Sequence, residues 1–224
     1  MSLNTYIKSS IGEKTLMAVT GIFLILFVIG HMLGNLQVFV GPDYLNAYAA
    51  QLQSLGPLLW LIRLFLAATM GVHIWAAAKV VRRSVTARPV KYAMQKDVAT
   101  NFAAKTMLVS GGLILVFIVY HVLHFTSGNI DPIGAFANAR TGDEVDVYGM
   151  VIASFQHLPT VLIYSVSMVV LCLHISHGAS SLVQTLGLRK CSSSCSDKIG
   201  PALAGFLLVG NLSIPLSIYF GLIS

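Results

Sequence analysis

The chain has 224 residues, of which 56% are hydrophobic and only 10% are charged, whereas about 25% of the residues of an average soluble domain are charged. A mean hydropathy of +0.79 excludes a water-soluble fold, and the low charge excludes a disordered chain or a coiled coil. The formal net charge is +6. In a chain this apolar we interpret the basic residues as determinants of membrane topology and expect no nucleic-acid partner.

Five stretches are long and apolar enough to cross a bilayer, which takes about 20 mostly apolar residues. They run over residues 15–37, 57–80, 104–126, 155–178 and 200–222, and none contains Asp or Glu. We interpret the first as a mature span rather than a signal peptide, because it is long and no small-residue cleavage pattern follows it. The prediction is an all-α membrane protein, with residues 1–224 forming one domain of five transmembrane helices.

The charged residues predict the orientation of these spans. Twelve of the 14 basic residues lie before the first span, around the second loop or in the fourth loop. The first and third loops carry Asp43, Asp131, Asp143, Glu144 and Asp146. The positive-inside rule therefore places the N-terminus in the cytoplasm and the C-terminus outside. Cys191 and Cys195 then face the reducing side, where we expect two free thiols.

Four histidines are predicted to lie inside the spans at two depths. At 1.5 Å per residue, His31 lies about 24 Å and His121 about 25 Å along spans that start inside, which places both near the outer face. His73 and His174 lie about 24 Å and 28 Å along spans that start outside, which places them near the cytoplasmic face. The two levels are about 15–20 Å apart.

Two pairs of imidazoles from different helices, stacked at two depths, match what bis-histidine ligation of two b haems requires. His124 and His177 follow one turn after His121 and His174, so either neighbour is an alternative ligand; depth favours His121 and His174. Small residues beside the histidines would leave room for a flat macrocycle, although close helix packing in membranes also uses them. They are Gly30, Gly34, Gly71, Ala76, Gly111, Gly112, Gly178 and Ala179.

The chain also resembles a known family. The segments FVIGH (27–31), GVHIWAAAKVVRR (71–83), FIVYH (117–121), LCLHISHGASS (171–181) and LNAYAAQLQSLGP (45–57) are similar to the di-haem cytochrome b membrane anchor of bacterial succinate dehydrogenase and fumarate reductase. The resemblance extends over nearly the whole chain. It implies a four-helix haem-binding bundle plus a fifth helix in the bacterial inner (plasma) membrane.

For the histidines, the resemblance implies that His31 and His121 hold the haem distant from the catalytic subunits, and that His73 and His174 hold the nearer one. It also implies a flavoprotein and an iron–sulfur subunit on the cytoplasmic face, with quinone, in particular menaquinone, as the electron partner in the membrane. The chain itself has no nucleotide-binding motif and no Fe–S cysteine set. We therefore expect it to be non-catalytic alone and to act as the electron-conducting subunit of a succinate:quinone oxidoreductase.

Further residues are candidates for supporting roles. Arg63 lies about 9 Å inside the second span, and an intramembrane charge is a functional hypothesis by default; we expect it to contact a haem propionate or a quinone oxygen, with snorkelling as the alternative. Candidates for the quinone site near the outer face are Gln51, Tyr48, His157 and His124. Basic residues of the second loop are candidates for contacts to the iron–sulfur subunit, unless they serve topology alone: Arg82, Arg83, Arg88 and Lys91.

Two other functions remain open. One is a haem b anchor of another quinone-linked enzyme, such as a hydrogenase or a formate dehydrogenase. The other is a histidine-lined metal transporter, since imidazole also suits Zn, Cu and Fe. Transporters usually place carboxylates, Met clusters or broken helices at the midplane, whereas these histidines avoid it.

Overall fold

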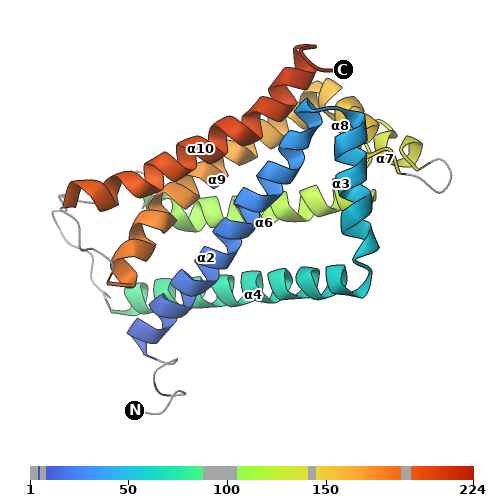
Figure 1. Ribbon diagram of the computed structural model, residues 1–224. Helices are drawn as coiled ribbons and strands as arrows, with labels where there is room; N and C mark the ends of the chain where they lie inside the picture. Colours follow the sequence, from blue (N-terminus) through green and yellow to red (C-terminus); the bar gives the residue numbers. More distant parts are fainter. Residues whose placement is uncertain (1–4, 6–8, 88–104, 141–144, 188–192) are drawn as a thin grey trace.

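The computed structural model describes residues 5, 9–87, 105–140, 145–187 and 193–224, with only the backbone described for 193–197. The described residues form helices and no strand. Five helices are long and apolar enough to span a membrane, which confirms the predicted all-α membrane fold. They alternate in direction along the chain (Figure 1).

The spanning helices are longer than the apolar stretches. Helix α2 runs over Ser10–Asn35 and continues as the 3-10 turn η1 (Leu36–Phe39), and α4 runs over Pro57–Thr86. Helix α6 (Met107–His121) continues as the π-helical turn η2 (Val122–Thr126). The last two are α9 (Leu158–Thr185) and α10 (Ser193–Tyr219). Polar residues at the ends are helical as well, so hydropathy locates the spans but not their ends.

The first span contains an acidic residue that the predicted boundary at residue 15 left out. Ser9 caps α2 by accepting a hydrogen bond from the Gly12 amide at 3.0 Å, so the helix begins at Ser10 and includes Glu13 in its first turn. A Ser at the N-cap and an acidic residue in the first turn both stabilise a helix start.

The segments between the spans contain three helices that the apolar stretches did not predict: α3 (Pro42–Ser54), α7 (Ala135–Asn138) and α8 (Val147–Gln156). Asp146 caps α8 through the Gly149 amide. Asn46 on α3 donates to Asp146 at 3.0 Å and accepts from the Tyr148 amide at 2.9 Å. These bonds tie α3 to α8 at the end of the bundle where the C-terminus lies (Figure 1).

Two apolar clusters hold most of the bundle together. One joins η1, α3, α8, α9 and α10 at the C-terminal end and includes Val38, Phe155 and Tyr164. The other joins α2, α9 and α10 around Met32 and Leu207, both fully buried. Helix α10 packs along α9, and α4 packs along α2. Only Thr69 and Ala76 are buried in α4, so most of its surface is free of protein contacts.

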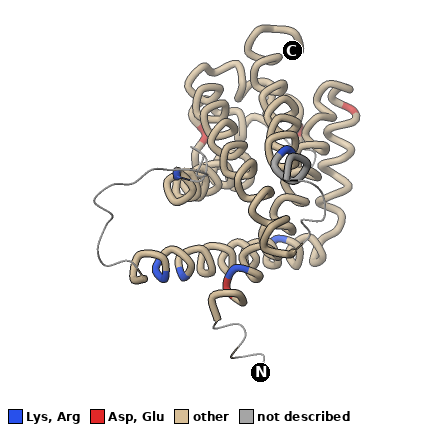
Figure 2. The backbone as a smooth tube through the Cα atoms, turned by 90° about the vertical axis from the view of Figure 1, so that its left-hand side faces the viewer, with Lys and Arg blue, Asp and Glu red and all other residues tan. Residues whose placement is uncertain are grey.

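Most of the described basic residues lie toward the end of the bundle where α2 and α6 begin and α4 ends, which faces the viewer in Figure 2. They include Lys14, Lys79, Arg82 and Lys105. Asp43 and Asp131 lie in the segments at the other end; Glu13, Arg63 and Arg140 are the exceptions to this separation. This separation matches the alternation of basic and acidic loops in the sequence.

Candidate functional site

The structure brings His31 of α2 and His121 of α6 together. Their ring centroids are 5.6 Å apart and the ring planes stand at 84°. With metal–imidazole bonds of about 2.0 Å, two rings on opposite sides of one metal ion have centroids on the order of 6 Å apart. The pair that the sequence predicts is therefore placed at the spacing that one shared metal ion requires.

We call His31 and His121 the outer pair, and His73 and His174 the inner pair, after the depths predicted from the sequence. Both rings of the outer pair form hydrogen bonds. The Asn35 amide nitrogen, which can only donate, lies 3.1 Å from His31 Nε2, so Nε2 carries a lone pair. The Tyr164 hydroxyl lies 3.2 Å from His121 Nδ1 and 3.1 Å from His124 Nδ1. One hydroxyl can accept from one ring and donate to the other. Tyr164 thus links the predicted ligand His121 to the neighbouring His124.

His73 is held in one tautomer by helix α2. Its Nδ1 lies 3.2 Å from the Met17 carbonyl oxygen and 3.1 Å from Thr20 Oγ1. A carbonyl can only accept, and the Thr20 hydroxyl donates to the Leu16 carbonyl at 2.8 Å, so Nδ1 must carry the proton. The lone pair of His73 is therefore on Nε2. Metal-bound histidines use this arrangement, in which the second ring nitrogen donates to a fixed acceptor.

His174 has the same arrangement, supplied by helix α6. Its Nδ1 lies 3.1 Å from Ser110 Oγ, and that hydroxyl donates to the Met107 carbonyl at 3.1 Å. Ser110 therefore accepts from His174, and Nε2 again has the lone pair. A glycine follows each hydroxyl residue, and a Cβ would lie 3.5 Å from His73 at Gly21 and 3.4 Å from His174 at Gly111. His73 and His174 thus each pack against a hydroxyl residue followed by a glycine, Thr20-Gly21 for His73 and Ser110-Gly111 for His174.

Open space lies next to several of the glycines that flank these histidines. A Cβ added at Gly30, Gly71, Gly112 or Gly178 would meet nothing within 4 Å. Gly30, Gly71 and Gly112 are exposed and Gly178 is partly buried, so room for a flat macrocycle beside them stays a prediction. Gly34 is different, because the Tyr48 side chain occupies the space beside it.

The remaining histidines have other surroundings. His124 is only 1% exposed, so it is enclosed behind Tyr120, whose ring centroid is 5.6 Å away. His157 lies between α8 and α9, and its Nδ1 is 3.0 Å from Thr160 Oγ1. His177 is half-buried on α9. Burial therefore argues against direct contact between His124 and a quinone.

The other two quinone candidates lie on α3. Tyr48 packs beside Gly34, one turn after His31 on α2, and so lies close to the outer pair. Gln51 is exposed, and its backbone carbonyl oxygen accepts a hydrogen bond from the Ser54 hydroxyl. The structure thus places Tyr48, but not Gln51, against the histidine-bearing helices.

Two arginines have partners within the chain that the sequence did not predict. Arg63 is exposed, and its guanidinium carbon lies 5.0 Å from the centroid of the Trp60 ring. Arg83 binds Glu13 through Nε at 2.6 Å and through Nη2 at 3.0 Å. The Arg83–Glu13 ion pair therefore joins α4 to α2, and of the two arginines Arg82 stays the candidate for contacts to a partner subunit. Arg88 and Lys91 lie outside the described residues.

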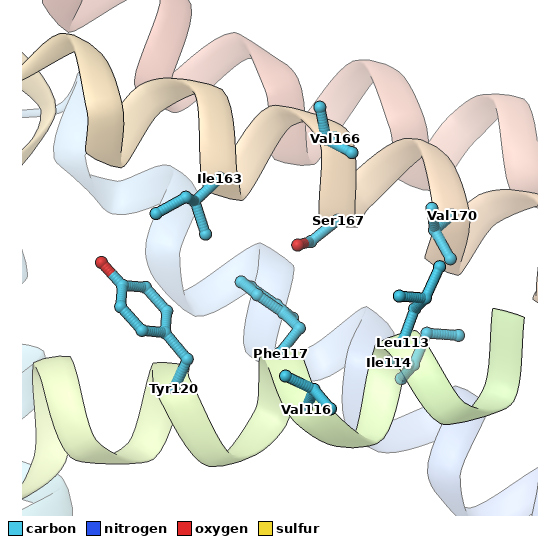
Figure 3. Close-up of a pocket in the computed structure, with 9 residues that line it drawn as sticks. All are labelled: Leu113, Ile114, Val116, Phe117, Tyr120, Ile163, Val166, Ser167 and Val170. Carbon is cyan, nitrogen blue, oxygen red and sulfur yellow. The ribbon is translucent and has the colours of Figure 1, made fainter. Parts of the chain in front are cut away.

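A shallow apolar groove of about 280 Å³ runs between α6 and α9. Figure 3 shows Phe117 projecting into it from α6, with the Tyr120 hydroxyl at one end and the Ser167 hydroxyl along the wall formed by α9. The Phe117 ring centroid lies 5.9 Å from that of His121. The Phe117 ring therefore lines the groove and is also in contact with His121 of the outer histidine pair.

Sequence reasoning missed Thr20, Ser110 and Tyr164, the side chains that hydrogen-bond four of the histidines. A signal for the first two is present, because Thr20-Gly21 and Ser110-Gly111 are matching hydroxyl–glycine pairs on the helices that precede His73 and His174. Tyr164 has no comparable signal, since its partners lie 40 and 43 residues away.

Within the described part of the chain, no three His, Cys, Asp or Glu side chains gather into a set that could hold a bare metal ion. Of the two predicted pairs, His31 and His121 are in ring contact, whereas no ring contact among the described residues joins His73 to His174, so that pair stays a prediction. No protein-family model matches the chain, and neither curated proteins nor solved structures gave a match to it. The class defined by the structure is a helical membrane protein with five candidate spans, in which one pair of histidines, His31 and His121, meets between two helices.

Proposed function

We propose that the chain is a membrane-embedded cytochrome b with two haems, which carries electrons between a soluble enzyme on the basic side of the membrane and a quinone in the bilayer. The observation that supports this best is the orientation of the imidazoles. His73 and His174 donate through Nδ1 and so present Nε2 as the lone-pair nitrogen, which is the form that binds a metal. At His31 the Nε2 lone pair accepts a hydrogen bond from Asn35, and this bond would have to open for a metal to bind there. Bound b haem supplies a one-electron carrier.

Each part of the chain has a role in this proposal. His31 and His121 would hold the outer haem, and His73 and His174 the inner one. Met17, Thr20 and Ser110 orient His73 and His174 before a haem binds, so little side-chain freedom of these two histidines is lost on binding. His73, His121 and His174 are partly buried between helices, whereas His31 is exposed on α2.

The proposed partners follow from the resemblance to the anchors of succinate dehydrogenase and fumarate reductase. An iron–sulfur subunit, itself bound to a flavoprotein, would dock on the face that carries Lys14, Arg82 and Lys105. Reduction of one quinone takes two electrons and two protons, and oxidation of the quinol returns them. We assign the chain to the plasma membrane of a bacterium, with the N-terminus in the cytoplasm and menaquinone as its electron partner.

The direct test is to purify the chain from its own membranes in mild detergent. We expect two b haems per chain in a pyridine haemochrome assay, together with a co-purifying flavoprotein and an iron–sulfur protein. Co-purification with a hydrogenase or a formate dehydrogenase would assign the haems to a different enzyme. A pigment-free preparation that holds Zn or Cu would contradict the proposal and favour metal transport.

A further inference from the structure

The groove between α6 and α9 has features of a ligand site open to the membrane. Leu113, Val116 and Val166 line it and are exposed, so a molecule can enter it sideways from the lipid. Its volume of about 280 Å³ lies at the lower end of the range for small-molecule pockets. A ligand that enters from lipid must itself be mostly apolar.

Two hydroxyl groups interrupt the apolar walls. Ser167 faces the space between the helices, and the Tyr120 hydroxyl lies at one end of that space (Figure 3). Tyr120 directly precedes His121 on α6. Hydroxyls inside a membrane gain from a hydrogen-bond partner, so two that line an apolar groove suit a ligand with polar atoms. The Thr160 side chain lies near the Tyr120 hydroxyl, and its Oγ1 is 3.0 Å from His157 Nδ1. A chain of polar groups therefore leads from the groove to the break between α8 and α9.

The position of Phe117 connects the groove to the redox centre. Its ring lies between the groove and His121, with centroids 5.9 Å apart, and it stands edge-on to Tyr164 at 5.1 Å. A flat aromatic ligand in the groove would stack against Phe117 and come within one ring of the proposed outer haem ligand. An acyl chain would use neither the hydroxyls nor the ring.

We propose that this groove binds the head of a membrane quinone, with Ser167 and Tyr120 donating hydrogen bonds to its carbonyl oxygens and Phe117 packing on its ring. This inference rests on the proposed function, because it places the electron partner next to the outer histidine pair. It differs from the expected quinone contacts: Tyr48, Gln51 and His124 do not line the groove, and His157 reaches it only through Thr160 and Tyr120.

The test uses the full chain in phospholipid nanodiscs and an azido-substituted naphthoquinone as a photolabel. We expect the label on peptides from 107–126 and 158–185, and competition by unlabelled 2,3-dimethyl-1,4-naphthoquinone. Ser167→Phe should fill the groove and abolish labelling. The matched control is Val169→Phe, which adds the same ring at a neighbouring, lipid-exposed position of α9. It should leave labelling unchanged.

Smaller substitutions separate the hydrogen bonds from the shape of the groove. Ser167→Ala and Tyr120→Phe should each weaken binding of the naphthoquinone about three- to tenfold, the usual worth of one hydrogen bond. Label on residues 42–54 instead, or labelling that Ser167→Phe does not reduce, would overturn the inference. Labelling that extra phospholipid displaces as well as naphthoquinone does would identify the groove as a lipid site and overturn it too.

The photolabel does not depend on haem, so the two proposals fail separately. A chain that carries two haems but is labelled outside the groove keeps the proposed function and loses this inference. A chain without haem loses the proposed function, whatever the label shows.

Discussion

The Nδ1 atom of His73 lies 3.2 Å from the carbonyl oxygen of Met17, a backbone group that can only accept. This contact between α4 and α2 determines where the proton of the imidazole sits and leaves Nε2 free to bind a metal. His174 on α9 reaches the same state through a side chain, Ser110 on α6. The difference between a backbone acceptor and a hydroxyl acceptor leads to the first prediction.

Ser110→Ala should raise the midpoint potential of the inner haem more than Thr20→Ala does. Ser110 is the hydrogen-bond acceptor for His174 Nδ1, whereas His73 keeps the Met17 carbonyl as its acceptor when Thr20 is lost. A hydrogen bond from Nδ1 makes the ligand more basic and favours the oxidised iron. Losing one bond corresponds to roughly 20–60 mV for one electron. Redox titration followed at the haem absorption bands measures the shift in midpoint potential. Equal shifts in the two variants would refute the assigned hydrogen-bond acceptors.

Tyr164→Phe should affect the outer haem and leave the inner one unchanged. The substitution removes the hydroxyl shared by His121 and His124. His124 is fully buried, so its unpaired nitrogen should destabilise the chain by about 1–3 kcal/mol. Thermal unfolding in detergent measures the stability, and the visible spectrum resolves the two haems. Tyr48→Phe, on a tyrosine outside this network, is the control, and an equal change in it would show that Tyr164 has no special role.

Gly178→Leu should prevent binding of the inner haem while the chain still folds. Gly178 lies one turn after His174 on α9, and the space beside it is open. A leucine there fills the proposed haem space without meeting a protein atom. Gly205→Leu on α10 is the matched control, since its Cβ position is also open. The haem content of the purified chain decides: retention of both haems in Gly178→Leu would mean that this space faces only lipid.

Glu13→Gln should loosen the attachment of α4. Glu13 is 2% exposed and Arg83 is half exposed, so breaking the pair leaves a partly buried guanidinium without its carboxylate. We expect a loss of about 1–3 kcal/mol, reduced from the value for a fully buried pair by the exposure of Arg83. Because α4 packs along α2, His73 should be disturbed as well. Thermal unfolding of Glu13→Gln, Arg83→Gln and the double variant measures the coupling energy, which should be close to zero if the pair is unimportant.

The bundle and the outer histidine pair were predictable from the sequence because hydropathy and helical rise depend on local composition. Five spans were expected and five are present, and equal depth correctly placed His31 beside His121. The ends were less predictable, since Ser10 and Thr86 are polar residues that helix geometry retains beyond the apolar stretch.

Contacts between distant residues were beyond sequence reasoning. Thr20 meets His73 across 53 residues, and Ser110 meets His174 across 64. The π-helical turn after His121 also has no hydropathy signal, yet it carries His124 into the aromatic group around Tyr164. The pairing of Glu13 with Arg83 depends on where α2 crosses α4, which a single sequence does not encode in any local pattern.

The most direct test of the account is to replace His31, His73, His121 and His174 one at a time with alanine and to titrate the haems of each purified variant. The account predicts that the His31 and His121 variants lose the same haem component, and that the His73 and His174 variants lose the other. Loss of one component by His31 and His73 together, or retention of both haems in any of the four variants, would contradict it.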